Sequence, residues 1–123
     1  MQYYIKQEND CISFDQFLHQ QEKRWKLHVR ESMSTLIRLC KQTILDVKAI
    51  CILAADILDM SRRTPSCIGD ETLDMRIYLS PVIHQLAKIV SDVDSNKMES
   101  GCISYNLKLI TRHAKVVEEY IVI

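Results

Sequence analysis

Glycine and proline are scarce in this chain of 123 residues, which contains two of each. Tight turns depend on these two residue types, so their scarcity argues against a turn-rich all-β fold. It favours long helices joined by few connections. Long apolar runs are also missing, because the longest uncharged one, residues 49–55, is bounded by Lys48 and Asp56. About 20 apolar residues are needed to span a bilayer, so we expect no transmembrane segment.

Motifs for metal and phosphate chemistry are absent from the sequence. It contains no C-x-x-C, no H-E-x-x-H and no Glu-x-x-His, and its only glycines, Gly69 and Gly101, cannot form a glycine-rich phosphate loop. The four histidines are scattered over the predicted helices without metal-ligand spacing. We therefore expect no metal, no cofactor and no enzymatic activity.

A net charge of either sign is missing too, since 16 basic side chains balance 16 acidic ones. Nothing global attracts this chain to nucleic acid or to an anionic membrane. Near-neutral charge also removes a barrier to self-association. The odd number of cysteines, five, and an N-terminus without an apolar signal segment predict reduced thiols in an intracellular protein, cytoplasmic or nuclear. The length predicts a single domain over residues 1–123.

What the chain does contain is a long heptad pattern between residues 33 and 58. Apolar residues recur at 4-3-4-3 spacing, which is typical of one stripe along a packed helix. We therefore expect a helix over residues 33–61. Residues 50–58 are apolar on most sides, which predicts that this part is the buried centre of the fold. The stripe consists of Met33, Ile37, Cys40, Ile44, Val47, Cys51, Ala54 and Leu58.

The other predicted helices follow from capping residues and a second stripe. Ser13 is a good N-cap, with Gln16 suited to the first turn, and it predicts a helix over 14–30. Between residues 11 and 65 there is no Gly or Pro, so a break at 30–35 and one long, bent helix over 14–61 are the two alternatives. Ser80 and Pro81 resemble a helix start, so residues 71–95 are expected to be helical with a kink or break near Pro81.

A second heptad stripe predicts the last helix, over residues 102–121. Two matching stripes and short connections predict an all-α fold: an antiparallel helical bundle of about four helices. Residues 1–12 are expected to form an extended N-terminal arm. The second stripe consists of Ile103, Leu107, Ile110, Ala114, Val117 and Ile121.

The most distinctive charged segment surrounds the single tryptophan. Lys23, Arg24, Lys26 and Arg30 flank Trp25, and the acidic residue in the segment's vicinity is Glu22. A basic helix with an aromatic side chain can bind phosphates, an anionic membrane or an acidic protein groove. In the alternative interpretation, Trp25 faces the core and the cations are solvated.

The chain ends carry a second set of candidate contacts. Tyr3, Tyr4, Tyr120, Ile121 and Ile123 either close the bundle or contact another subunit. Our leading hypothesis is a non-catalytic helical module for protein–protein interaction or assembly, acting as an adaptor or oligomer subunit. The alternative is nucleic-acid or membrane-surface binding through residues 23–30.

The third hypothesis is a thiol or metal-dependent enzyme. Cys40 and Cys51 lie on the first stripe and are expected to be buried and inert. Cys67 lies in a predicted loop and Cys102 opens the last predicted helix, so either would be the reactive thiol beside a histidine.

Overall fold

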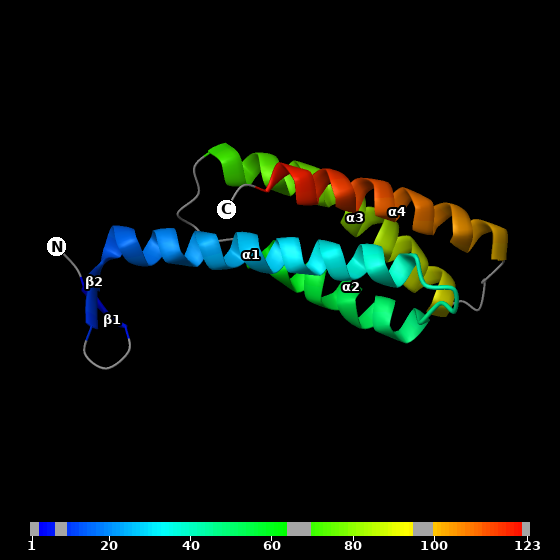
Figure 1. Cartoon of the computed structure of the whole chain (residues 1–123), viewed down its shortest axis with the longest axis horizontal. Coiled ribbons are helices and arrows are strands. Elements are labelled where there is room, and N and C mark those ends of the chain that lie inside the picture. Colours follow the sequence, from blue (N-terminus) through cyan, green and yellow to red (C-terminus); the bar gives the residue numbers. More distant parts are fainter. Residues whose placement is uncertain (1–2, 7–9, 64–69, 95–99, 122–123) are drawn as a thin grey trace.

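Four helices and a short hairpin make up the computed structural model, which describes residues 3–6, 10–63, 70–94 and 100–121. Consecutive helices run in opposite directions, and each packs against two others in a closed ring: α1 with α2, α2 with α3, α3 with α4, and α4 with α1 (Figure 1). The predicted antiparallel helical bundle is therefore confirmed. The elements are β1 (Tyr3–Lys6), β2 (Asp10–Ser13), α1 (Phe14–Cys40), α2 (Val47–Arg62), α3 (Asp70–Asp94) and α4 (Ser100–Tyr120).

The N-terminal arm is a hairpin rather than a single extended segment. β1 and β2 pair antiparallel, with Tyr3 opposite Ser13 and Lys6 opposite Asp10. The hairpin stands at the N-terminal end of α1, beyond the four packed helices (Figure 1). The sequence does not predict the pairing because one short apolar cluster does not fix a strand partner.

Ser13 caps α1 as predicted. Its hydroxyl accepts from the amide of Gln16 at 3.3 Å, and the Gln16 side chain accepts from the amide of Ser13 at the same distance. This reciprocal pair is a capping box, which satisfies two amides at the start of the helix.

The break between the first two helices lies at residues 41–46, so the prediction of a break at 30–35 is wrong, and so is the single bent helix over 14–61. α1 continues to Cys40, and Asp46 begins α2 by accepting from the amide of Ala49 at 3.0 Å. Ile44, which the first stripe places on the packed seam, lies in this connection with 86% of its surface exposed. The first heptad stripe is therefore interrupted in the folded chain.

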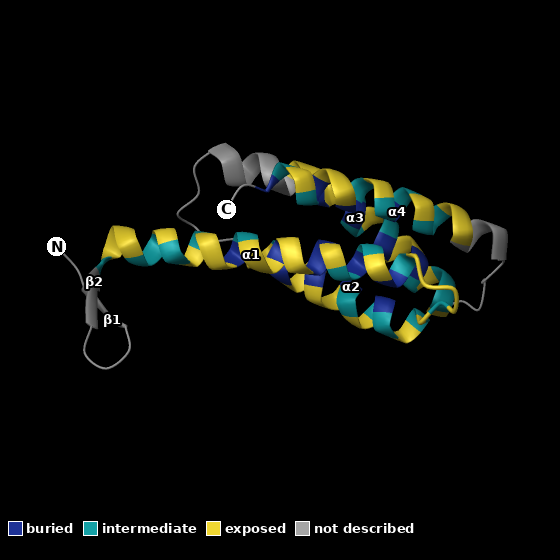
Figure 2. Cartoon of the chain, in the orientation of Figure 1, coloured by how far each residue is buried: buried dark blue, intermediate teal, exposed yellow. Residues whose placement is uncertain are grey.

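The core runs along one side of each helix (Figure 2). In α1 it starts at Trp25, and no residue among the first three turns, 14–24, is buried. The second stripe is confirmed from Ile110 to Ile121, while Ile103 lies outside the residues whose side chains are described. The buried apolar residues are Trp25, Val29, Met33, Leu36, Leu39, Ile50, Ala54, Ile57, Met60, Leu79, Val82, Leu86, Ile89, Ile110, Ala114, Val117 and Ile121.

Helix α2 is only partly covered, so the prediction that residues 50–58 are buried on all sides is wrong. Ile50, Ala54 and Ile57 face the core, but Ile52 is 63% exposed and Leu58 is 37% exposed. In a bundle whose ring places α2 beside α1 and α3 alone, the outward side of α2 has no helix to cover it among the described residues.

The sequence predicts a kink or a break near Pro81. Helix α3 is continuous through Pro81, so the chain has no break there. Proline lacks the amide that would bond the carbonyl four residues earlier, which belongs to Ile77. Ile77 is 64% exposed, so this turn of the helix lies on the solvent side of the bundle.

Candidate functional site

Trp25 belongs to the core. Its side chain is 7% exposed, and the indole Nε1 donates to the carbonyl oxygen of Met60 at 3.0 Å. Met60 lies in the last turn of α2, where the backbone carbonyl groups have no amide further along the helix to accept from. The indole therefore joins α1 to the end of α2.

Two side chains of the basic segment, Lys26 and His28, pair with acidic ones, whereas Lys23, Arg24 and Arg30 are exposed. Lys26 pairs with Glu22 at 3.2 Å within α1, and His28 pairs with Asp56 of α2 at 3.2 Å. Asp56 comes from another helix, so sequence spacing alone does not show this second pair.

A polar cleft of about 380 Å³ between α1 and α2 combines both signs of charge. Within it Asp59 pairs with Arg63 at 3.3 Å, at the spacing of four that favours such pairs on a helix. The cleft is lined by Gln21, Arg24, Trp25, His28, Asp56, Asp59, Met60 and Arg63.

Among the cations of residues 23–30, Lys23, Arg24 and Arg30 are exposed, with the half-exposed Leu27 between them in the sequence.

The candidate residues at the chain ends do not form one described site. Tyr120 packs against Tyr78 of α3 with ring centroids 4.6 Å apart, and Ile121 is 6% exposed. These two close the bundle. Tyr3 and Tyr4 lie on β1, but their side chains, and all of Ile123, are outside the described residues.

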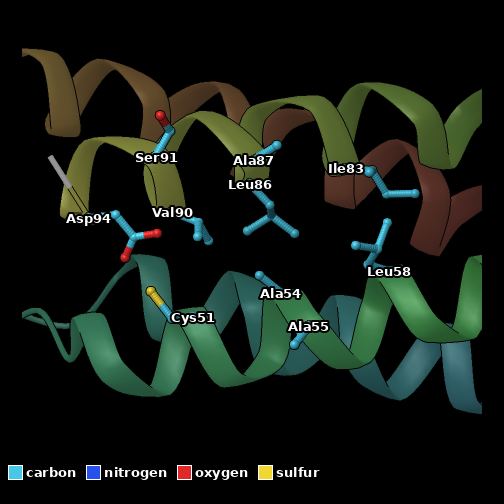
Figure 3. Close-up of a pocket in the computed structure, with 10 residues that line it drawn as sticks. All are labelled: Cys51, Ala54, Ala55, Leu58, Ile83, Leu86, Ala87, Val90, Ser91 and Asp94. Atoms are coloured by element: carbon cyan, nitrogen blue, oxygen red, sulfur yellow. The ribbon is translucent and has the colours of Figure 1, made fainter.

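A larger open surface lies between α2 and α3, where sequence reasoning places no site. This groove has a volume of about 500 Å³. Leu86 and Val90 of α3 point toward α2, and Cys51 and Leu58 of α2 point toward α3 (Figure 3). We call it the α2–α3 groove; it is lined by Cys51, Ala54, Ala55, Leu58, Ile83, Leu86, Ala87, Val90, Ser91 and Asp94.

The groove has a simple origin in the sequence. Ala54, a small side chain, lies between the two helices, and the small side chains of Ala55, Ala87 and Ser91 stand at the edge, so the space between the helices is left partly unfilled. Ala54 and Leu86 are buried at its floor, whereas Ala55 and Ala87 are exposed at its rim. The groove is therefore apolar inside and open to solvent at its edges.

One sequence signal does mark this surface. Cys51, Ala54 and Leu58 belong to the first heptad stripe, whose spacing predicts a packed seam. In the fold this part of the stripe faces the α2–α3 groove. An a/d stripe identifies an apolar helix side but not whether a neighbouring helix covers it.

Cys40 is half-buried between α1 and α4. Burial raises the pKa of its thiol from the ordinary 9.0 to about 11, and a hydrogen bond with the Thr111 side chain acts weakly in the opposite direction. Thiolate is the reactive form, so the raised pKa lowers the reactivity of Cys40 at neutral pH. Cys67 lies outside the described residues, and the side-chain surroundings of Cys102 do as well.

The Cys40 pKa predicts slow alkylation. At pH 8 the native thiol should react roughly 100-fold more slowly than the same thiol in urea, because two pKa units remove that much thiolate. Peptide mass spectrometry after timed maleimide labelling measures both rates, and equal rates would contradict the burial.

The raised pKa of Cys40 also affects stability. The stability contributed by the neutral Cys40 thiol is fully present below pH 9 and is lost as pH rises through about 11.

No metal cluster and no membrane-crossing helix occur among the described residues: no three His, Cys, Asp or Glu side chains are grouped for a metal ion, and none of the helices is long and apolar enough to span a bilayer. Comparison of the chain with protein-family models, with curated proteins and with solved structures finds no match.

Proposed function

We propose that this chain is a non-catalytic helical module for protein–protein interaction or assembly, and that the α2–α3 groove is its docking surface. The observation that supports the proposal is the α2–α3 groove itself. It is apolar, has a volume of about 500 Å³, and its rim residues Ala55, Leu58 and Ala87 are exposed. Apolar surface of this kind costs free energy when it faces water, and its burial drives association.

The shape of the groove suits a helix. On α3 its wall runs from Ile83 through Ala87 and Val90 to Asp94, at 4-3-4 spacing. A helical segment of this length spans about 16 Å, or roughly three turns. An amphipathic helix with apolar residues at i, i+4 and i+7 fills a groove of this length.

Electrostatic binding through residues 23–30 remains the alternative hypothesis. The pair Lys26–Glu22 reduces the free positive charge of the segment, and Trp25 is not available to stack on a base or insert into a membrane. Lys23, Arg24 and Arg30 are the exposed cations that such binding would use. The groove is the better-supported docking surface because its apolar walls are open.

Photo-crosslinking tests the groove directly. Ala87 at the rim is replaced by the photoreactive amino acid benzoylphenylalanine, and Val116 on α4, which is 42% exposed and away from the groove, receives the same substitution as a matched control. The purified variants are irradiated in an extract of the source cells, and the adducts are sequenced by mass spectrometry. We expect polypeptide adducts at position 87 that are much weaker at 116. Equal adducts at both positions would remove the groove as a docking surface.

A further inference from the structure

The outward side of α2 carries a short pattern that the core does not use. Lys48, Ile52, Ala55 and Asp59 follow one another at 4-3-4 spacing and are all exposed, Ile52 at 63%. This spacing places the four on one side of the helix. We call this set the outer stripe.

The outer stripe is complementary to itself when two copies run antiparallel. Its midpoint falls between Leu53 and Ala54, so a two-fold axis there places Lys48 of each copy against Asp59 of the other. The same axis places Ile52 against Ala55 of the second copy, a large apolar side chain against a small one. A parallel arrangement would instead oppose Lys48 to Lys48 and Asp59 to Asp59.

Isologous contact of this kind is the commonest way for identical chains to pair. The ion pairs would form at the edges of the contact, where they select orientation more than they add affinity. Asp59 already pairs with Arg63, but its side chain remains 55% exposed and can accept a second cation.

The outer stripe is continuous with the docking surface. Ala55 belongs both to the stripe and to the rim of the α2–α3 groove. An α2 helix from a second copy laid along this rim would bring its Ile52 over Ala55, whose small side chain permits close approach. Contact with α3 as well as α2 enlarges the buried area beyond what the 16 residues of one helix offer.

We infer that α2 of a second copy of this chain packs on the outer stripe, along the rim of the α2–α3 groove, held antiparallel by two symmetric Lys48–Asp59 pairs. The inference rests on the proposed function, because it names the partner of that same groove. The zero net charge of the chain places no overall repulsion between the two copies.

Charge reversal with complementation is the test. Sedimentation velocity over a wide concentration range is measured for the wild type, Lys48→Glu, Asp59→Lys and an equimolar mixture of the two variants. Each variant alone opposes like charges at both symmetric pairs, so its dimer dissociation constant should rise roughly tenfold or more. In the mixture, the new carboxylate at position 48 of one chain meets the new ammonium at position 59 of the other, while the native Lys48 and Asp59 also meet. The mixture should therefore dimerise about as well as the wild type.

Two controls keep the result interpretable. Lys115→Glu makes the same charge change on α4, at an exposed position outside the groove, and should leave the dimer unchanged. Circular dichroism of each variant checks that the helices persist, and high salt should reduce the difference between wild type and variants. A further variant, Ile52→Asp, should weaken the dimer by removing the apolar contact with Ala55. Mixing it with either charge variant should not restore the dimer.

The outcomes separate this inference from the proposed function. A wild type that stays monomeric, single variants that dimerise like the wild type, or a mixture that is not rescued would each overturn antiparallel pairing. If the wild type is monomeric and position 87 still crosslinks to a different polypeptide, the groove is a docking surface for that protein and the second copy is excluded. A monomer with no adducts at position 87 contradicts both.

Discussion

Replacing Trp25 with alanine is expected to lower the free energy of unfolding by about 3–5 kcal/mol, the usual cost of truncating a large buried aromatic side chain. Trp25 is 7% exposed and packs where α1 meets the end of α2. Chemical denaturation followed by far-ultraviolet circular dichroism measures the change, since the substitution removes the only tryptophan.

The hydrogen bond to Met60 can be separated from the packing. Trp25→Phe keeps an aromatic ring but deletes the Nε1 donor, which leaves the Met60 carbonyl without this partner. A buried acceptor that loses its partner costs about 1–3 kcal/mol. Leu27→Ala is the matched control, because Leu27 is two residues away but 46% exposed, and its loss should stay within about 1 kcal/mol.

The same series distinguishes the two interpretations of the basic segment. If Trp25 instead contacted a partner protein, its replacement would change the free energy of unfolding only a little. If Trp25→Ala unfolds at the same denaturant concentration as the wild type, the core assignment is wrong.

The second large effect is expected at Leu36, with Ile37 as its comparison. Leu36 is 0% exposed, so Leu36→Ala should cost about 2–5 kcal/mol through lost burial and the cavity left behind. Ile37 packs at the edge of the core and remains partly exposed, so Ile37→Ala should cost about 1–2 kcal/mol. Parallel denaturation curves for the two variants give the ranking.

This ranking tests where the core stripe of α1 lies. The heptad pattern in the sequence contains Ile37 and omits Leu36, whereas the fold buries Leu36 more deeply. A larger loss for Ile37→Ala than for Leu36→Ala would show that the seam in the sequence, and not the packing of the folded helices, is the true core.

Local chemistry makes much of the fold predictable. Ser13 with Gln16 marks the start of α1, and the second stripe marks α4, because caps and apolar periodicity act within a few residues. The bounds of α3 and α4 agree with the predicted 71–95 and 102–121 to within one or two residues at each end.

The break after α1 escapes prediction because its sequence resembles helix. Residues 41–46 contain no glycine or proline, and Ile44 happens to continue the 4-3-4-3 spacing across the connection. The clearest local signal is Asp46, an N-cap residue type that is common enough elsewhere in helices to be overlooked. Packing of α1 against α2, which depends on contacts far apart in sequence, decides where the chain reverses.

The α2–α3 groove escapes prediction for a related reason. A stripe that packs against a neighbour and a stripe that lines an open groove have the same residue pattern, so Cys51 and Leu58 resemble core positions. The pairing of His28 with Asp56 is hidden in the same way, because it joins two helices. Both features depend on the order of helices around the ring, which periodicity does not encode.

The bare start of α1 has a consequence for how the molecule unfolds. Residues 14–24 contain no buried side chain, so this part of α1 contributes little to the core, and its capping box and the pair Lys26–Glu22 stabilise it locally. Helical segments that bury little apolar surface are marginal in water. The amide protons of the turns before Trp25 are therefore expected to exchange faster than those of the turns after it. α1 is cooperative with the rest of the bundle only from its single tryptophan onward.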